Sequence, residues 1–160
     1  MELSLKFKPI SEENFEIFLQ LIQRLADYEK REGPDTQAKV RLKRDGLSDN
    51  PKYEGFLGFE KEQVIGCITY LITYSTFLAL PKLYIEDLFI LEEFRRRGFA
   101  QQFFKFCIKQ AQKRGCGKVE WNVLTWNEPA IKLYEKIGAV RQGWYFYQIN
   151  KEDFTEFLKE

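Results

Sequence analysis

The chain has 160 residues, with 25 lysine and arginine residues against 24 aspartate and glutamate residues, so its formal net charge is +1. It contains no histidine. This composition excludes Ser-His-Asp triads, Cys-His pairs, histidine-ligated zinc and imidazole proton shuttles. Any proton transfer that the protein catalyses must therefore use carboxylates, tyrosine, lysine, cysteine or water.

The length suits one domain over residues 1–160, and the 44% hydrophobic content is ample for a packed core. The sequence lacks the long apolar run of a membrane span, and its start lacks the pattern of a signal peptide. The nearly neutral charge argues against a nucleic-acid partner. Because Cys67, Cys107 and Cys116 are scattered, we expect reduced thiols in a cytoplasmic protein.

The first half of the chain predicts two helices followed by strands. Apolar residues at helical spacing predict a helix from Ser11 to about Lys30, and a short amphipathic helix follows over residues 36–44. Runs rich in β-branched and aromatic residues predict strands over 55–59, 64–74 and 83–91.

The second half alternates helices and strands. A helix ending at Gly115 is expected, with one apolar face made of Ala100, Phe103, Phe104, Cys107, Ile108 and Ala111. A strand over 118–124 comes next, and Asn127 can cap a helix that buries Ile131, Tyr134 and Ile137 and ends at Gly138. A strand over 144–149 and a helix over 153–159 complete an α/β domain with at least one parallel strand pair.

The turn around Gly98 lies between a buried strand and an amphipathic helix. Such a turn aims unpaired backbone N–H groups and the positive helix end at one point, and glycine lets a ligand approach closely. This geometry suits a phosphate or pyrophosphate, although Arg95, Arg96 and Arg97 also fit a solvated basic turn. A Walker loop and a dinucleotide fingerprint are both absent from this stretch.

Two further features carry chemistry. Glu86 and Asp87 interrupt an apolar strand, and adjacent strand residues point to opposite faces, so at least one carboxylate is expected to face a cavity or a covered layer. A salt bridge at the sheet edge is the alternative. Tyr134, on the helix after Asn127, is by itself compatible with a core position.

Together these motifs resemble the GNAT N-acetyltransferases. Arg95-x-x-Gly98-x-Ala100 matches the family's Arg/Gln-x-x-Gly-x-Gly/Ala motif. The stretch from Trp126 to Tyr134 is similar to the helix start of the diamine (spermidine/spermine) and thialysine acetyltransferase branch, and residues 83–90 and 25–29 also fit that branch. The resemblance implies a mixed, mostly antiparallel central sheet with a splayed parallel strand pair, flanked by helices.

The resemblance also implies roles for single residues. Tyr134 corresponds to the tyrosine that protonates the departing CoA thiolate, and Glu86 to the carboxylate that accepts the proton of the amine. Residues that would bind acetyl-CoA are Leu88, Phe89, Ile90, Arg95, Arg96, Arg97, Gly98, Phe99, Ala100, Gln101, Asn127, Glu128, Pro129 and Ala130. Residues that would contact the amine substrate are Tyr28, Glu29, Glu86, Asp87, Glu120, Trp121 and Asn122.

The chemistry of amine acetylation agrees with these roles. An alkylamine with a pKa of about 10.4 must lose a proton before it can attack, which costs about 4.6 kcal/mol at pH 7. A carboxylate can hold the ammonium ion and relay its proton, and tyrosine can donate to a thiolate through a preformed hydrogen bond. Neither role needs histidine or a metal.

One departure from the branch bears on the substrate. Its polyamine enzymes carry an acidic residue two positions before the late tryptophan, where this chain has Gln142 after Arg141. A long polycation needs several carboxylates along its path, so a lysine analogue or short diamine is favoured over spermine. A peptide amine as substrate, and a non-catalytic acyl-CoA-binding module, remain open, as does a purely structural role of Asp87. A homodimer is expected by resemblance.

Overall fold

The computed structural model describes residues 4–159, which divide after Asn122 into two compact units. The first unit contains, in chain order, β1 (Lys6–Pro9), α1 (Phe15–Tyr28), α2 (Thr36–Gly46), β2 (Glu54–Glu60), β3 (Gln63–Ser75), β4 (Leu80–Ile90), the 3-10 helix η1 (Glu92–Phe94), α3 (Phe99–Lys113) and β5 (Val119–Trp121). The second contains α4 (Glu128–Lys136), η2 (Lys151–Asp153) and α5 (Phe154–Phe157).

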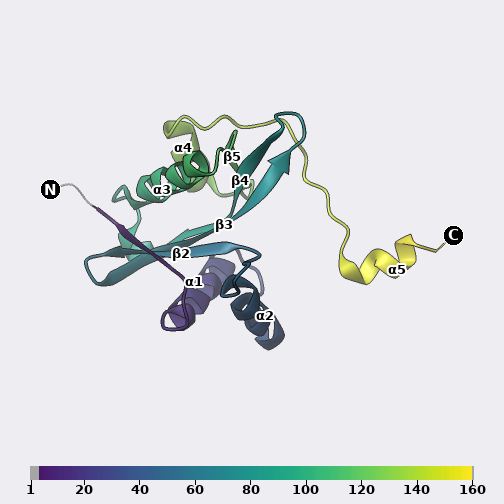
Figure 1. Ribbon diagram of the computed structural model, residues 1–160, viewed down its shortest axis with the longest axis horizontal. Helices are drawn as coiled ribbons and strands as arrows, with labels where there is room; N and C mark the ends of the chain where they lie inside the picture. Colours follow the sequence, from purple (N-terminus) through teal and green to yellow (C-terminus); the bar gives the residue numbers. More distant parts are fainter. Residues whose placement is uncertain (1–3, 160) are drawn as a thin grey trace. The chain divides into compact units, whose positions relative to one another are not determined.

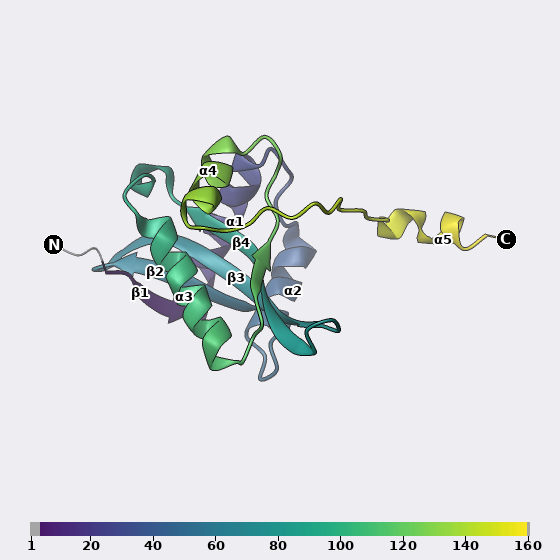
Figure 2. The ribbon, with the colours of Figure 1, turned by 90° about the horizontal axis from the view of Figure 1, so that it is seen from above.

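The first unit is built on a mixed five-stranded sheet. The strand order is β1-β2-β3-β4-β5, with antiparallel pairs from β1 to β4 and a parallel pair β4–β5. Helices α1 and α2 cover one face and α3 lies across the other (Figures 1 and 2). The expected mixed, mostly antiparallel sheet with flanking helices is therefore confirmed.

Strand β1 was missing from the sequence prediction. It has only four residues, alternating between lysine and an apolar or proline residue, so its pattern is too short to stand out. Packing fixes it in place, because the Phe7 ring stacks on Phe106 at 4.3 Å and meets Phe103 edge-on at 5.0 Å. These contacts tie the edge of the sheet to α3.

The parallel pair separates partway along β4. Strands β4 and β5 pair only from Leu83 opposite Val119 to Ile85 opposite Trp121. Beyond Ile85, β4 continues to Ile90 with no strand on that side among the described residues. This is the predicted splay, and it leaves the backbone edge of β4 open next to Glu86.

The helices differ from the expectation in detail. Helix α1 begins at Phe15 because residues from Ser11 to Asn14 form a turn, in which the Ser11 N–H donates to Oδ1 of Asn14 at 2.8 Å. Ile108, predicted on the buried face of α3, is 48% exposed, whereas Phe99 is buried. No helix among residues 4–159 is long and apolar enough to cross a membrane.

The expected strand over residues 144–149 is not formed in the second unit. These residues are exposed and pair with no strand of the described chain. Their composition suits a strand, but a strand needs a partner for its backbone hydrogen bonds. The terminal helix is also shorter than predicted, since α5 spans only Phe154–Phe157, and β5 covers only part of the predicted 118–124 strand.

Candidate active site

Strand β4 contains a β-bulge at Glu86. The adjacent residues Thr69 and Tyr70 of β3 lie opposite Asp87 and Ile85 of β4, so no β3 residue lies opposite Glu86. Glu86 is therefore the extra residue, and Ile85 and Asp87 point to opposite faces although they are two positions apart. The bulge interrupts the simple alternation along β4, and the half-buried Asp87, bonded to the buried Thr69, meets the expectation that at least one carboxylate faces a covered layer.

Asp87 is held by a cross-strand hydroxyl group. Oγ1 of Thr69 donates to Oδ2 of Asp87 at 2.6 Å and accepts from the Asp87 backbone N–H at 3.1 Å. Thr69 is buried, and burial raises the pKa of Asp87, while the Thr69 hydrogen bond and the charge of Arg31 act in the opposite direction. This double contact fixes the orientation of the strand beside Glu86.

Glu86 is more exposed than Asp87, and its pKa is also raised. Partial burial is the main cause, followed by repulsion from the Asp87 carboxylate, while Arg31 favours the charged form. A carboxyl group with a raised pKa is a better proton acceptor than one in water. Glu86 has the properties of a general base at the point where β4 and β5 separate.

The end of α1 contributes further predicted substrate residues. The Arg31 guanidinium lies 3.4 Å from a carboxylate oxygen of Glu29, and it acts electrostatically on both Glu86 and Asp87. Tyr28 lies under the guanidinium of Arg95, which is 4.7 Å from the ring centroid. The structure thus gathers carboxylates and two arginines, Arg31 and Arg95, around the end of α1.

The β5 residues divide between the two faces. The Nζ atoms of Lys82 and Lys118 both form ion pairs with Glu120. Partial burial acts to raise the pKa of Glu120, but these two ion pairs outweigh it and lower the pKa. Asn122 donates from Nδ2 to the Tyr84 hydroxyl at 2.9 Å. The Trp121 ring instead packs on Phe104 of α3, with centroids 4.8 Å apart. Trp121 is therefore on the α3 face, opposite Glu120.

The predicted acetyl-CoA residues of β4 lie along its open edge. Phe89 is buried, while Leu88 and Ile90 are half-buried. The carbonyl oxygen of Ile90 accepts from Nε of Arg95 at 2.9 Å. An extended amide-containing ligand can add to this edge in the manner of a strand.

The turn before α3 has the backbone shape of an anion site. Arg96 has φ of +62° and Gly98 has φ of +82°, and a Cβ atom built on Gly98 would meet nothing within 4 Å. Gly98 precedes the first residue of α3, Phe99, and no side-chain hydrogen bond caps this helix. The N–H groups of the first turn, including those of Ala100 and Gln101, have no acceptor within the helix, and they lie at the positive end of the helix dipole.

The three arginines of the turn have different surroundings. Arg95 is fixed by Ile90, Tyr28 and Phe89, and Arg97 lies 3.5 Å from Glu60 and over two phenylalanine rings. Arg96 is exposed and makes no ion pair within the described part of the chain. Arg95 and Arg97 therefore shape the turn, and Arg96 is the side chain available for an anionic ligand.

The second unit holds the remaining predicted residues. Oδ1 of Asn127 accepts from the Ala130 N–H at 3.4 Å, which confirms the predicted cap of α4. Glu128 and Pro129 form the first positions of the helix, where proline is tolerated. Tyr134 lies on α4 and is half-buried.

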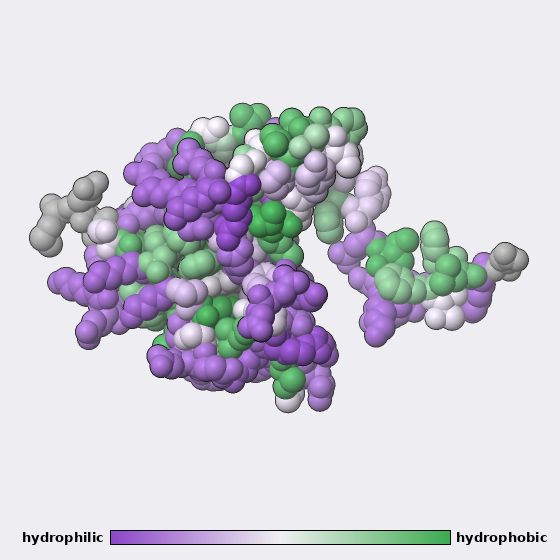
Figure 3. All heavy atoms as spheres, viewed as in Figure 1, coloured by the Kyte–Doolittle hydropathy of each residue, from purple (hydrophilic) through white to green (hydrophobic). Residues whose placement is uncertain are grey.

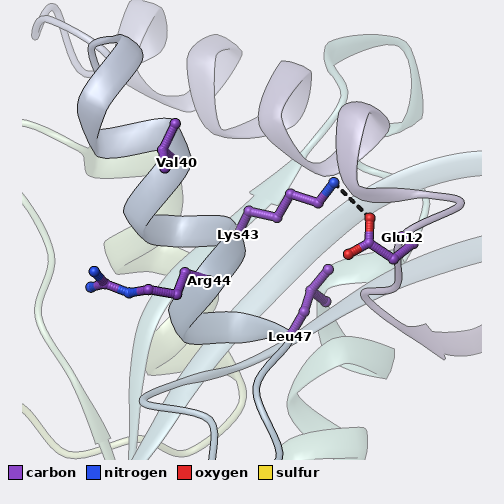
Figure 4. Close-up of a pocket in the computed structure, with 5 residues that line it drawn as sticks. All are labelled: Glu12, Val40, Lys43, Arg44 and Leu47. Atoms are coloured by element: carbon purple, nitrogen blue, oxygen red, sulfur yellow. Dashed lines mark ion pairs between the residues drawn. The ribbon is translucent and has the colours of Figure 1, made fainter.

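A separate hollow of about 390 Å³ lies between the turn before α1 and helix α2 (Figure 4). Nζ of Lys43 reaches across it to Oε2 of Glu12 at 2.6 Å, and Arg44 pairs with Asp45. None of the predicted site residues lines this hollow. Of its charged lining residues, Glu12 and Lys43 are paired with each other, and Arg44 is paired with a residue outside the lining.

Sequence reasoning missed Thr69, Arg31 and Tyr84. Thr69 and Tyr84 enter the site through strand pairing, which has no local signal in the sequence. Arg31 follows Glu29 by two residues, and its N–H donates to the Ala26 carbonyl at 2.9 Å, which closes the end of α1. The only sequence signal that could have placed Arg31 in the site was its short distance along the chain from Glu29.

Comparison with known proteins identifies the class. The model of the acetyltransferase (GNAT) family matches residues 18–139. The chain therefore belongs to the GNAT acetyltransferase family, and it is an acetyl-CoA-dependent N-acetyltransferase.

Two relatives refine the comparison. The chain is 29% identical over 155 residues to a thialysine N-epsilon-acetyltransferase of Caenorhabditis elegans, covering 94% of this chain and 95% of the relative. It is 41% identical over 93 residues to an L-ornithine N5-acetyltransferase of Arabidopsis thaliana, covering 57% of this chain and 41% of the relative. The first of these lies in the branch that the motifs resemble.

The fold has counterparts among solved structures. An integron cassette protein from V. cholerae superposes with a TM-score of 0.80 and 19% sequence identity, covering 99% of this chain and 100% of that protein. At this identity the likeness concerns the fold alone.

Proposed function

We propose that this protein transfers the acetyl group of acetyl-CoA to the primary amine of a small cationic substrate, a lysine analogue or a diamine or polyamine, by direct attack in a ternary complex. The observation that carries the proposal is the position of Glu86. This carboxylate lies on a bulge where β4 loses its β5 partner, beside an open strand edge that leads to the turn at Gly98.

The open edge and the turn fit acetyl-CoA. Backbone groups of Leu88 and Phe89 would pair with the amides of its pantetheine arm, while N–H groups around Gly98 and the side chain of Arg96 would hold its pyrophosphate. The space beside Gly98, which a Cβ atom would partly fill, supports close approach of a phosphate. On the other side, residues 127–130 would line the cofactor, as the family resemblance implies.

Two residues would move the protons. The raised pKa of Glu86 suits a base that takes the proton of the bound ammonium ion, directly or through water, so that the neutral nitrogen attacks the thioester carbonyl. When the tetrahedral adduct collapses, the C–S bond breaks and the leaving thiolate takes the phenolic proton of Tyr134. The products are the acetylated amine and free CoA, and no metal is needed.

The charges around Glu86 favour an amino acid as the amine substrate. Glu29, Glu86 and Asp87 would attract one ammonium group, while Arg31 lies among them as a single positive charge. A lysine analogue or ornithine carries a carboxylate that can pair with Arg31, and a polyamine carries only further positive charge. The relatives that act on thialysine and on ornithine support this choice.

We further propose that residues 1–160 act as one acetyltransferase domain, that two copies form a homodimer, and that the protein works in the cytoplasm without a nucleic-acid partner. The family match from 18 to 139 crosses the division after Asn122, which supports a single functional domain. The free thiols of Cys67, Cys107 and Cys116 are compatible with a reducing compartment.

The test is an initial-rate study with acetyl-CoA and ornithine, in which CoA release is followed at several concentrations of each. We expect amine-dependent release and intersecting double-reciprocal lines, as a ternary complex requires. Parallel lines would contradict direct attack. Tight CoA binding without amine-dependent release would instead support a non-catalytic acyl-CoA-binding module.

A further inference from the structure

A buried threonine lies next to the two carboxylates of β4. Polar side chains normally lie at the surface, and Figure 3 shows mainly hydrophilic residues over α1 and α2. Thr69 of β3 is the exception. It is 3% exposed, and among residues 4–159 it is the only buried residue that is polar or charged, when tyrosine and cysteine are counted as apolar. A buried hydroxyl group costs free energy unless it forms hydrogen bonds, and valine would fill the same space without that cost.

The hydrogen bonds of this hydroxyl group go to Asp87. Oγ1 of Thr69 donates to Oδ2 of Asp87 at 2.6 Å and accepts from the Asp87 backbone N–H at 3.1 Å. A hydroxyl group has only one proton, and here that proton is committed to the carboxylate. A hydrogen bond donated to a carboxylate favours its charged form, so Thr69 lowers the pKa of Asp87 against the larger, opposite effect of burial. Thr69 therefore stabilises ionised Asp87 inside the protein.

The β-bulge brings the charge of Asp87 next to Glu86. The two carboxylates are consecutive, but only Asp87 lies opposite a β3 residue, and Glu86 is exposed. The pKa of Glu86 is raised first by partial burial and then by repulsion from the Asp87 carboxylate. When two carboxylates interact in this way, a single proton goes to the one whose charged form is less stabilised. The hydrogen bond from Thr69 favours Glu86 as the site of that proton.

The other groups around the pair do not make this distinction. Arg31 acts from the end of α1 on both carboxylates and favours the charged form of each. The remaining titratable groups nearby are a cysteine and two tyrosines with raised pKa values, which stay uncharged while carboxylates titrate, and two carboxylates that form ion pairs. They are Cys67 on β3, Tyr53 before β2, Tyr84 on β4, Glu29, and Glu120 on β5.

We propose that Thr69 is a positioning residue for the base of the reaction: it holds Asp87 in its charged form, so that the proton released by the substrate ammonium ion comes to rest on Glu86. In this step the N–H bond of the ammonium ion breaks, the nitrogen keeps the electron pair for its attack on the thioester, and the Glu86 carboxylate gains the proton. Asp87 remains charged and continues to attract the amine. The inference rests on the proposed function for the role of Glu86, while the order in which the two carboxylates take up a proton is measured without substrate.

The first experiment uses the unaltered protein. The carboxyl carbons of Glu86 and Asp87 are followed by NMR in isotope-labelled protein as the pH is lowered. We expect the Glu86 signal to report the first proton and the Asp87 signal the second. A first proton on Asp87 would overturn the proposal, and this outcome depends neither on activity nor on the folding of a variant.

The second experiment compares Thr69→Val with Thr69→Ser, because valine removes the hydroxyl group and serine keeps it. In Thr69→Val we expect the first proton on Asp87. Glu86 then stays charged and loses the repulsion of its neighbour, so the acidic limb of the kcat–pH profile should move to lower pH by at least about 0.5 unit, roughly a threefold change in proton concentration. Thr69→Ser should keep the order of protonation and the limb of the unaltered protein.

Two further variants separate the possible failures. In the Asp87→Asn background, Thr69→Val should move the acidic limb no further, because Thr69 acts through Asp87. An unmoved limb in Thr69→Val, or equal shifts with and without Asp87, would assign Thr69 to the fold alone. An acidic limb that persists in Glu86→Gln would overturn the base role itself. A limb that is lost in Glu86→Gln but unmoved by Thr69→Val would overturn only the role of Thr69.

Discussion

Replacing Gly98 by alanine tests the proposed pyrophosphate site against a control within the same helix. Gly98 and Gly115 flank the two ends of α3, with φ of +82° and +65°, and a Cβ atom at either position would meet nothing within 4 Å. Forcing alanine into the left-handed region costs about 1–2 kcal/mol. Gly98→Ala and Gly115→Ala should therefore destabilise the protein by similar amounts.

Only Gly98→Ala should weaken the binding of CoA. The new methyl group would stand where a phosphate approaches the N–H groups of the turn, and the loss of one hydrogen bond to a charged group costs about 1.5–3 kcal/mol. At about 1.4 kcal/mol per tenfold change, the Kd for CoA should rise at least tenfold, as measured by titration calorimetry. Urea unfolding of both variants checks the shared loss of stability. Equal Kd values for the two variants would refute the site.

Three further outcomes follow from the proposed roles. Tyr134→Phe should lower kcat by about 100-fold or more while the Kd for CoA stays within about twofold, and a kcat within about threefold of the unaltered enzyme would remove the acid role. For Glu86→Gln, the rate should fall and the acidic limb of the pH–rate profile should disappear, because that limb reports protonation of Glu86 at its raised pKa; an unchanged profile would exclude the base role. Asp87 has a raised pKa in the fold, so its charged form opposes folding. As the pH rises through that pKa, the unaltered protein should therefore lose stability relative to the Asp87→Asn variant. The free energies of unfolding of the two proteins, measured by urea unfolding, should converge near pH 3, where Asp87 is protonated in both the folded and the unfolded state. A constant difference across that pH range would show that Asp87 is not buried as described.

Local signals predicted the helices and most strands. Helix α3 could be recognised because its apolar residues recur with helical spacing and Gly115 follows its end. The family motifs indicated Glu86 and Gly98, and the structure places Glu86 on the bulge where β4 loses its β5 partner and Gly98 directly before α3.

The features that sequence reasoning missed depend on contacts between distant residues. The bulge at Glu86 exists only in the register between β3 and β4, and the hydrogen bonds of Asp87 depend on Thr69, eighteen positions earlier. Residues 144–149 show the opposite case. They have strand composition, but one chain provides no partner strand among its described residues, so the local pattern alone could not determine their structure.

The most direct test of the account is acetyl transfer from labelled acetyl-CoA to a panel of amines that contains lysine analogues, ornithine, short diamines, spermine and peptides. The account predicts acetylated product, with a higher kcat/KM for the amino acids and short diamines than for spermine. Absence of labelled product from every amine, with CoA binding intact, would contradict it.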